Sequence, residues 1–377
     1  MKDEGRRAGD LDSGRERAPS PRSRWGRRPR YSSPRQDEVH SDVIRGAPTY
    51  AALDLGTNNC RLLVARPTHD SFRVIDAFSR IIRLGEGVSR SRRISDAALG
   101  RAIEALAICR DKMRNRGVTR ARLIATEACR AAENGLEFRT RIAEQVGLEL
   151  EIIDRETEAT LAATGCTPLI DPQADGVVLF DIGGGSSELV RLERSPPARH
   201  GPPLPTIKAW VSLPVGVVTL AERHGGRTVT RETYAAMIAE VAAFVDRFVA
   251  EHGSLRPNGT HLLGTSGTVT TIAGVHLDLR RYERRRVDGC WMGDDQVTRV
   301  IERLLGWSYE ERVANGCIGA ERADLVLAGC AILDAIRRAF PCGRLRVADR
   351  GLREGILATL MAEDGVYPGE RRPAWRR

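Results

Sequence analysis

Two distant stretches of the chain share one layout of apolar and polar positions. Residues 49–67, TYAALDLGTNNCRLLVARP, form an apolar run, a Gly/Asn-rich turn and a second apolar run, with no helical period between them. Residues 176–193, GVVLFDIGGGSSELVRLE, repeat this order of apolar run, acidic residue, Gly-rich turn and apolar run. We therefore predict a β-hairpin at each place, and the repetition predicts two lobes of related architecture.

Helical periodicity follows the first hairpin. Leu99, Ile103 and Leu106 fall on one face of a predicted helix. Ser95 precedes it as the expected N-cap, and Gly117 is its expected stop. The same reasoning predicts strands at 122–126, 149–153, 207–213 and 344–348, helices from about 154, at 230–252, 320–340 and 351–363, and a strand that enters a helix at 261–274. The mixture of strands and helices predicts an α/β protein.

Length and composition support two cores in a soluble chain. The chain has 377 residues, of which 41% are hydrophobic. That is enough for two ordinary domains. The sequence contains no apolar run of membrane-spanning length, and its Arg-rich start lacks the apolar stretch of a secretory signal. We expect a cytoplasmic protein with no membrane association.

The two ends of the chain differ in composition from the rest. Residues 1–47 and 366–377 are rich in Arg and Pro and carry little apolar periodicity. Such segments cannot offset the entropy of ordering, so we predict disordered basic tails. A tether for nucleic acid or polyphosphate is the functional alternative for the first tail, although a solvated tail is the favoured interpretation.

Charge and cysteine usage narrow the chemistry only a little. Lys and Arg number 59 and Asp and Glu 50, an excess of 59 − 50 = 9 positive charges. This excess favours an anionic partner without choosing among them. The eight cysteines form no CxxC pair, and the seven histidines form no HxH or HExxH motif. We expect reduced, buried cysteines and no histidine-based metal site.

Both hairpin turns carry residues suited to phosphate binding. Asp54 and Asp181 each end an apolar strand and precede a turn of Gly and small polar residues. Glycines let successive backbone N–H groups converge on one point, and Ser, Thr and Asn add donors. The candidate phosphate-binding residues are Gly56, Thr57, Asn58 and Asn59 in the first turn and Gly183, Gly184, Gly185, Ser186 and Ser187 in the second. Each Asp could hold a hydrated divalent cation beside the phosphates. The alternative for a single turn of this kind is an ordinary tight β-turn.

A third candidate anion site follows later in the chain. GTSGT at 264–268 lies between a predicted strand and a predicted helix, where backbone N–H groups and the helix dipole favour an anion. Ser266 is the candidate contact. The alternative is a helix cap formed by Ser266 or Thr268, which is compatible with anion binding.

Taken in order, these segments resemble the exopolyphosphatase and guanosine pentaphosphate phosphatase (Ppx/GppA) family in its short two-domain form. The resemblance rests on DLGTNNCRLLV, RLGEGV, ATEACRAA, DIGGGSSELV, SLPVGVVTL, GTSGT and DRGLREGIL. It covers roughly residues 48–365. It implies two ribonuclease-H-like lobes of the actin-like superfamily, with a cleft between them in which an acidic residue activates water against a terminal phosphate.

The resemblance also implies roles for individual residues. Glu158 in DRETEATLA matches the family's catalytic carboxylate, which would orient and deprotonate the attacking water. Asp181 and Glu188 match an acidic pair that we assign, with Asp54, to Mg²⁺. Arg130 matches a substrate-contacting arginine, because a planar guanidinium suits phosphate oxygens. Without the resemblance, Glu158 is one of several acidic residues in a helix's first turns, Arg130 a surface arginine and Glu188 an exposed strand residue.

The resulting hypothesis is a Mg²⁺-dependent exopolyphosphatase with one lobe at 48–158 plus the C-terminal helix 349–365, and a second lobe at 159–348. Cleavage of guanosine pentaphosphate is the nearest alternative. A sugar kinase and a non-catalytic nucleotide sensor are further rivals, but no adenosine pocket or sugar-binding Asp is identifiable for the kinase. Nucleic acid is not an expected partner, and a homodimer is one candidate oligomeric state.

Overall fold

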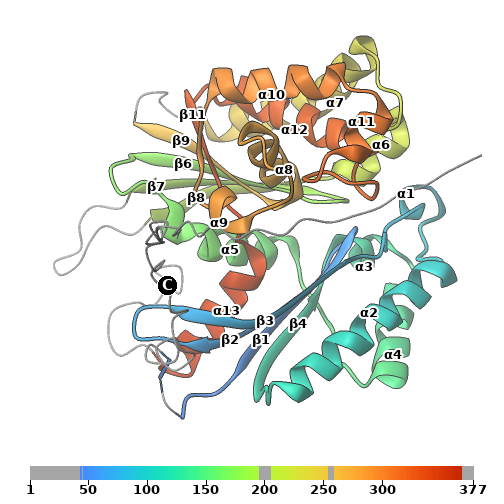
Figure 1. The fold of residues 1–377 in the computed structure, drawn as a ribbon, viewed down its shortest axis with the longest axis vertical. Coiled ribbons are helices and arrows are strands. Elements are labelled where there is room, and N and C mark those ends of the chain that lie inside the picture. The colour runs from blue at the N-terminus through green and yellow to red at the C-terminus, as the bar shows by residue number, and fades with distance from the viewer. Residues whose placement is uncertain (1–42, 45, 195–204, 254–258, 367–377) are drawn as a thin grey trace, which may run out of the picture. The chain divides into compact units, whose positions relative to one another are not determined.

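The computed structural model describes residues 43–44, 46–194, 205–253 and 259–366. Almost all of the two predicted basic tails therefore lies outside the described residues. Two mixed β-sheets with helices dominate the described part of the chain (Figure 1). Within it, no helix combines the length and the apolar character needed to cross a membrane.

The first sheet contains the first predicted hairpin. Its strands are β1 (Tyr50–Leu55), β2 (Asn59–Pro67), β3 (Phe72–Ile81), β4 (Arg120–Ala125) and β5 (Glu151–Ile152). Their order is β3-β2-β1-β4-β5, with β2 antiparallel to β1 and β3, and β4 parallel to β1 and β5. The predicted strand at 149–153 is thus confirmed only at Glu151–Ile152.

The second sheet contains the second predicted hairpin. Its strands are β6 (Gly176–Ile182), β7 (Ser187–Arg194), β8 (Pro205–Leu213), β9 (Thr260–Thr265), β10 (Trp291–Gly293) and β11 (Arg344–Val347). Their order is β10-β11-β9-β6-β7-β8. Apart from the added edge strand β10, this sheet has the order and strand directions of the first. The predicted repeat and the α/β two-lobed fold are confirmed.

Side-chain alternation along β1 explains why both faces of the first sheet are covered. Ala51, Leu53 and Leu55 contribute to one core, which is completed by α2 and α4. Tyr50 and Ala52 point to the opposite face, where α13 lies. The helices of this lobe are α1 (Val88–Ser91), α2 (Asp96–Asn115), α3 (Glu127–Ala131) and α4 (Gly135–Val146).

The predicted features of α2 are confirmed by the structure. Ser95 Oγ accepts a hydrogen bond from the Ala98 amide at 3.2 Å, which is the N-cap interaction. Leu99 and Leu106 are buried in the core. Gly117, directly after the helix, has a φ of 62°, in the left-handed region that favours glycine.

The second lobe has a thicker helical layer on one face of its sheet. Its helices are α6 (Val217–His224), α7 (Arg231–His252), α8 (Ser266–His276), α9 (Arg284–Val287), α10 (Asp294–Gly306), α11 (Tyr309–Ala314) and α12 (Val326–Ala339). Most of them pack with alternate residues of β6, such as Val178 and Phe180, into one large core. The prediction for 230–252 is confirmed to within one residue, with Thr230 as the N-cap of α7.

The prediction of a helix over 320–340 is wrong at its start, because α12 begins at Val326. Tertiary hydrogen bonds compete with helix formation here. The buried guanidinium of Arg312 donates to the carbonyl oxygens of Ala323, at 2.9 Å, and Gly226, at 3.1 Å. The segment before α12 is therefore held in turns by a side chain from another element. The sequence shows this arginine but not its partners.

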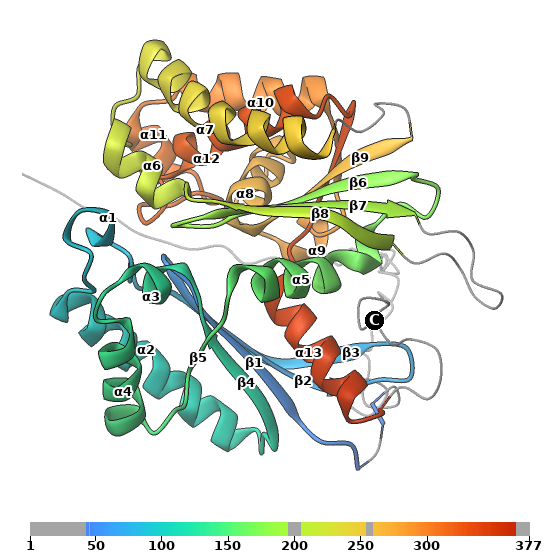
Figure 2. The same cartoon turned by 180° about the vertical axis from the view of Figure 1, so that it is seen from behind.

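Helices α5 (Arg155–Cys166) and α13 (Leu352–Glu363) lie between the two sheets, as Figure 2 shows from behind. A short 3-10 turn, Thr167–Leu169, follows α5. Ala159 and Ala163 of α5 pack on the second sheet, whereas Ile356 and Leu360 of α13 pack on the first. The layers therefore run sheet, α13, α5, sheet, and the chain passes between the lobes through these two helices.

Glycines allow α5 and α13 to touch backbone to backbone. A Cβ atom at Gly165 would lie 1.9 Å from the carbonyl oxygen of Gly351, and one at Gly355 would lie 1.9 Å from that of Leu161. No side chain fits at either position without separation of the helices. All eight cysteines lie within the described residues; none forms a disulfide and seven are buried, as predicted.

We predict that Gly165→Ala lowers the free energy of unfolding by about 1–3 kcal/mol, because the added methyl group forces the two backbones apart. Gly100→Ala on α2 is the matched control. A Cβ there meets no atom within 4 Å, so this change should be neutral or slightly stabilising through helix propensity. Urea unfolding midpoints of the two variants measure the difference. Equal midpoints would contradict the close crossing.

Candidate active site

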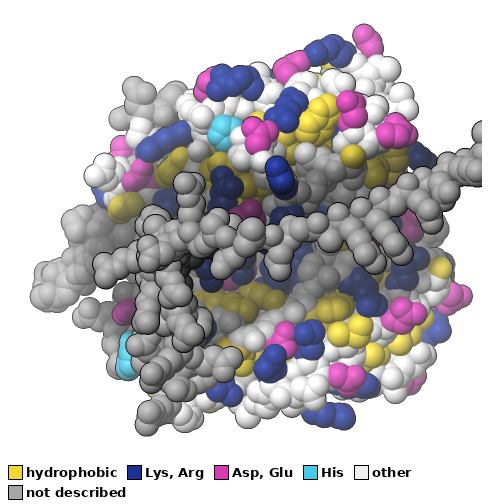
Figure 3. Space-filling model, in the orientation of Figure 1, with side chains coloured by type: hydrophobic (Ala, Val, Ile, Leu, Met, Phe, Trp, Pro, Cys, Tyr) yellow, Lys and Arg dark blue, Asp and Glu magenta, His cyan; other side chains and the backbone are white. Residues whose placement is uncertain are grey.

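A cavity of about 770 Å³ lies between the two lobes, and both predicted phosphate loops line it. Figure 3 shows Lys and Arg side chains in the hollow between the lobes. Thirteen of the fifteen predicted site residues line this cavity: Asp54, Gly56, Thr57, Asn58, Asn59, Glu158, Asp181, Gly183, Gly184, Gly185, Ser186, Glu188 and Ser266. Arg130 and Ser187 do not. Residues more than 200 positions apart thus form one site.

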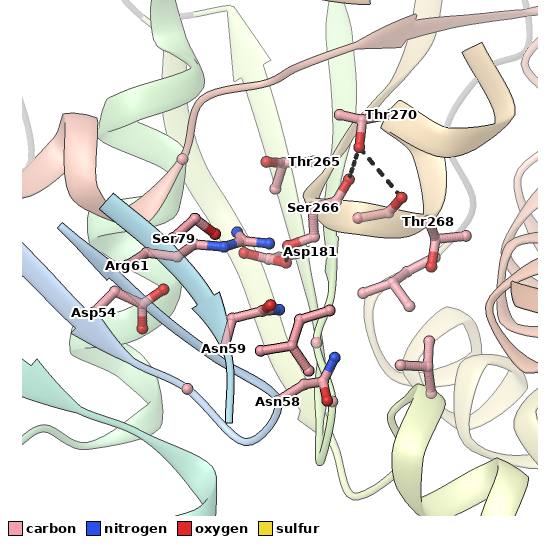
Figure 4. A pocket seen from close by; sticks show the side chains of 18 of the residues that line it. Asp54, Asn58, Asn59, Arg61, Ser79, Asp181, Thr265, Ser266, Thr268 and Thr270 are labelled. Carbon is pink, nitrogen blue, oxygen red and sulfur yellow. Dashed lines mark hydrogen bonds between the residues drawn. The ribbon is translucent and has the colours of Figure 1, made fainter. Parts of the chain in front are cut away.

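The first loop joins β1 to β2 as a tight turn. Its turn is closed by the Gly56 amide, which donates to the Asn59 carbonyl at 2.9 Å. The side-chain Oδ1 atoms of Asn58 and Asn59 are buried and have no hydrogen-bond partner within the described part of the chain. Both side chains extend into the cavity (Figure 4). A buried amide without a partner is costly, so a ligand with polar atoms is expected beside them.

The second loop joins β6 to β7 and is braced by the start of α6. The amides of Val217 and Val218 donate to the carbonyls of Gly183 and Gly184, at 2.9 and 2.8 Å. Two backbone acceptors of this loop are therefore already engaged. Ser187, predicted as a phosphate ligand, is fully buried, and its hydroxyl donates to the Val215 carbonyl at 2.7 Å.

Asp54 and Asp181 face the cavity from equivalent positions in the two hairpins. Burial raises the pKa of Asp54 above its ordinary value, although the nearby guanidinium groups of Arg61 and Arg353 oppose this shift. Burial also raises the pKa of Asp181, opposed by a hydrogen bond from Ser266 and by Arg61. Both carboxylates are thus held in a site that favours a cationic neighbour when they ionise.

Arg61 was not singled out in the sequence, although the repeat contains a signal for it. In the first hairpin Asp54 pairs with Arg61, and in the second Asp181 pairs with Glu188. Directly paired residues of antiparallel strands share one face, so both partners reach the cavity. Figure 4 shows the Arg61 guanidinium beside Asp181, on the other lobe. A comparison of the two hairpins would have found it.

Glu188 is buried on β7 and accepts hydrogen bonds through Oε1 from Ser186, at 2.7 Å, and from Ser212, at 3.0 Å. Burial raises its pKa well above the ordinary value, and the carboxylates of Glu158 and Asp181 raise it further. The alternative of an exposed strand residue is wrong for Glu188.

Glu158 lies at the start of α5, behind the N-cap formed by Asp154, whose side chain accepts from the Thr157 amide at 2.7 Å. The side chain of Glu158 is only 13% exposed. Burial raises the pKa of Glu158 to about 7, against the opposing effect of Arg130. A carboxylate with such a pKa can accept a proton near neutral pH.

Arg130 lies behind the cavity wall and holds Glu158. Its Nη2 donates to Glu158 Oε2 at 2.7 Å and to Glu127 Oε2 at 2.9 Å, and its Nη1 donates to the Ile153 carbonyl at 2.8 Å. The side chain is 13% exposed, so the alternative of a surface arginine is wrong. Direct contact with substrate phosphate remains a prediction, and the structure gives Arg130 protein partners instead.

Ser266 occupies a strained position at the start of α8. Its φ is 77°, which is uncommon for a residue with a side chain. The Ser266 hydroxyl donates to Asp181, and the N-cap residue of this helix is Thr265, whose side chain forms no cap. The alternative of a helix cap by Ser266 or Thr268 is therefore wrong. The dashed lines of Figure 4 show Thr270 bonded to the backbone at this helix start.

Arg83 in RLGEGV and Arg353 in DRGLREGIL have different positions. Arg353 lines the cavity, and burial lowers its pKa. Arg83 instead forms an ion pair across the lobes with Asp324, through two hydrogen bonds of 3.1 and 3.2 Å. Nearby, Glu222 of the second lobe accepts from the Gly87 amide at 2.9 Å. These contacts close the lobes together on the side away from α5 and α13.

The described residues form no metal site with a complete set of protein ligands. Within the described ranges, no three or more His, Cys, Asp or Glu side chains form a group that could hold a metal ion. The residues still fit Mg²⁺, which commonly takes one or two carboxylates together with water and substrate phosphate oxygens. Asp54 and Asp181 are buried carboxylates of this kind.

Thr57 connects the two loops across the cleft. Thr57 leaves no room for a side chain at three glycines. A Cβ atom at Gly85 would lie 2.2 Å from Thr57 Cγ2. A Cβ at Gly184 would lie 2.9 Å from Thr57 Cβ, and one at Gly185 would lie 2.9 Å from Thr57 Oγ1. Three glycines thus leave the space that the threonine side chain fills. Since Gly184 and Gly185 belong to the second lobe, this packing sets the distance between the loops.

We predict that Gly85→Ala destabilises the protein by about 1–3 kcal/mol, because its methyl group meets Thr57 Cγ2. Thr57→Ser removes that carbon and should restore most of the loss when combined with Gly85→Ala. A double-mutant cycle of unfolding free energies measures this coupling. Additive effects of the two substitutions would contradict the described packing.

Comparison with known proteins was consistent with this geometry. Residues 63–364 match the Ppx/GppA phosphatase family. The chain is 26% identical over 322 residues to the guanosine-5'-triphosphate,3'-diphosphate pyrophosphatase of Aeromonas salmonicida, covering 85% of this chain and 61% of that protein. The chain thus spans less than two thirds of this relative.

Solved structures match over nearly their full length. The Ppx/GppA family member of Aquifex aeolicus superposes with a TM-score of 0.69 at 26% identity, covering 84% of this chain and 98% of that one. An exopolyphosphatase-like protein superposes with a TM-score of 0.72 at 27% identity, covering 84% and 99%. With the fold, the repeated loops and the matched residues in agreement, the chain belongs to the Ppx/GppA phosphatase family.

Proposed function

We propose that the protein hydrolyses the terminal phosphoanhydride bond of inorganic polyphosphate and releases phosphate. The observation that carries this proposal is the cavity in which two Gly-rich loops face each other beside Glu158. Loops of this kind bind phosphate oxygens, and Glu158 adds a group that can activate water. The pairing of these two functions in one cavity favours a hydrolase over a binding protein.

Glu158 is the proposed general base. Its carboxylate is buried and held by Arg130, so it points in a defined direction and loses little entropy in the reaction. It takes a proton from the attacking water, and the bond between water oxygen and terminal phosphorus forms as the anhydride bond breaks. The pKa of about 7 suits this transfer at neutral pH.

Fixed positive charge stabilises the negative charge spread over the transferred phosphoryl group. Arg61, Arg284 and Arg353 line the cavity. Together with the backbone amides of the two loops, they would surround a bound phosphate with fixed positive charge and hydrogen-bond donors. In this proposal Arg130 acts by holding Glu158, and direct contact between Arg130 and substrate is an untested alternative.

We propose Mg²⁺ as the cofactor, held by Asp54 and Asp181, with Glu188 contributing through water. Bound there, the ion would neutralise phosphate charge and polarise the phosphorus–oxygen bonds. The burial of these carboxylates supports the proposal, because ionised groups in such a place need a nearby cation.

Guanosine pentaphosphate is the alternative substrate, since the same chemistry removes its terminal phosphate. The name of the Aeromonas relative supports this alternative, and the exopolyphosphatase-like structure supports the first. We propose a cytoplasmic location in either case, in line with eight cysteines that form no disulfide. Phosphate release from polyphosphate, pentaphosphate and ATP, measured in parallel, separates the alternatives. A wild-type protein inert on all three would favour a nucleotide sensor.

We predict that Glu158→Gln lowers kcat by on the order of 10² to 10⁴ fold while leaving polyphosphate binding intact, because the amide keeps the size but cannot accept the proton. In the wild type, kcat should fall as pH drops through about 7, since protonation removes the base. Glu156→Gln, an exposed position of the same helix, is the matched control. A Glu158→Gln variant within a few fold of wild type would show that another carboxylate is the base.

We predict that Asp181→Asn weakens the dependence of the rate on Mg²⁺ and reduces turnover, because a neutral amide is a poorer ligand for a hard cation. Asp171→Asn is the control, since Asp171 is paired with Arg344 and does not line the cavity. Mg²⁺ titrations of phosphate release measure the effect. An unchanged titration in Asp181→Asn would remove this residue from the metal site.

A further inference from the structure

A further acidic residue of the first lobe reaches the cavity and has no role in the proposed reaction so far. Glu127 begins α3 and lines the cavity, with a side chain that is 12% exposed. Its Cγ lies against the second phosphate loop, 3.1 Å from the place a Cβ atom would take at Gly185. A buried carboxylate is costly without a partner, so its contacts indicate why it is there.

Glu127 shares one guanidinium with the proposed base. Arg130 donates from Nε and Nη2 to Glu127 Oε2, at 3.1 and 2.9 Å, and from Nη2 to Glu158 Oε2 at 2.7 Å. With the bond from Nη1 to the Ile153 carbonyl, four of the five N–H groups of this arginine are used. Arg130 is therefore fixed in place by Glu127 and the backbone, and Glu158 is held by Arg130.

A second arginine completes a chain of alternating charges. Arg155 Nη2 donates to the other oxygen of Glu127, Oε1, at 2.9 Å, and the Arg155 side chain is 46% exposed. The sequence of contacts from solvent to the cavity is Arg155, Glu127, Arg130 and Glu158. Glu127 divides its negative charge between Arg155 and Arg130. A change at Arg155 or at Glu127 therefore alters how strongly Arg130 attracts Glu158.

We propose that Glu127 is a positioning residue that orients Arg130 and limits its attraction for Glu158, so that Glu158 stays basic enough to accept a proton. This inference rests on the proposed function of Glu158. A guanidinium committed to Glu158 alone would form a simple ion pair, and a carboxylate in such a pair is a weak base. Because Arg130 is shared with Glu127, Glu158 keeps its orientation and also its basicity.

Other charged groups also face Glu158. They are Arg130 on α3, Asp54 on β1, Asp181 on β6 and Glu188 on β7. The three carboxylates disfavour ionisation of Glu158, and Arg130 favours it. None of the four is altered in the variants proposed below, so a change in the behaviour of Glu158 would report on Glu127 and Arg155.

The test compares the acidic limb of the pH profile of kcat in three variants. Glu127→Gln keeps the side-chain shape and removes a negative charge, so the limb should move to lower pH, by about one unit. At high pH its kcat should fall a few fold, because the base is weaker. Arg155→Gln removes a positive charge and should move the limb to higher pH. This shift should be smaller than that of Glu127→Gln, because Arg155 is partly exposed to solvent.

Arg122→Gln is the matched control. Arg122 forms a similar two-bond ion pair in the same lobe, with Glu151 at 2.8 and 2.9 Å, but does not contact Arg130 or Glu127. Its pH profile should equal that of the wild type. A purely structural role of Glu127 would lower activity without moving the limb in opposite directions in the two test variants. Profiles of Glu127→Gln and Arg155→Gln that coincide with the wild type would overturn the proposal.

A second measurement does not depend on turnover. ¹³C NMR of protein labelled at the glutamate side-chain carboxyls follows the ionisation of Glu158, whose signal is the one missing in Glu158→Gln. The same opposite shifts should appear in this titration. If the wild-type protein hydrolyses no phosphoanhydride, the proposed function fails, and the NMR titration still decides whether Glu127 controls Glu158. Unshifted NMR titrations in both variants would overturn the inference.

Discussion

The arrangement of this protein depends on the direct backbone contact between α5 and α13. Gly165, Gly351 and Gly355 leave no side chain between the two helices, so each helix can cover the inner face of its own sheet while touching the other. The chain passes from the first lobe to the second through α5 and returns through α13, so both connections take part in this contact. The distance and angle between the lobes therefore depend on the crossing, as does every group that the two lobes contribute to the cavity.

The crossing also positions the chemistry. Glu158 is in the first turns of α5, and Arg353 is at the start of α13, so the ends of the two crossing helices both meet the cavity. On the other side of the cleft, Thr57 packs against the glycines of the second loop and Arg83 pairs with Asp324. The lobes are thus held at two separate places with the cavity between them.

The cavity combines buried carboxylates with buried or half-buried arginines, and neither set is fully neutralised by the other. Burial raises the pKa of Asp54, Asp181 and Glu188, and it lowers that of Arg353. Such a site is electrostatically incomplete without a ligand that carries negative oxygens together with a cation. That requirement agrees with a phosphate chain bound with a divalent ion, and it explains why so many charged groups are tolerated away from water.

Much of the fold follows from local sequence. Alternating apolar residues and Gly-rich turns specify the hairpins β1–β2 and β6–β7, and the caps at Ser95, Asp154 and Thr230 begin their helices where expected, because these interactions involve neighbouring residues only. The exceptions come from distant contacts. The start of α12 is displaced by the hydrogen bonds of Arg312. The ten-residue edge strand β3 is not among the predicted strands, because it is only partly buried and its apolar pattern is weak.

The features of the candidate site also fall into those set by local sequence and those set by distant contacts. The sequence by itself determined the two Gly-rich loops, the acidic residues that end β1 and β6, and the place of Glu158 on its helix, since each depends on a short motif. Only the tertiary structure decided that Ser187 faces the protein interior, that Arg130 holds Glu158, and that Glu127 joins the cavity. The physical reason is that hydrogen-bond partners and burial are set by residues far away in the chain, which the crossing of α5 and α13 brings together.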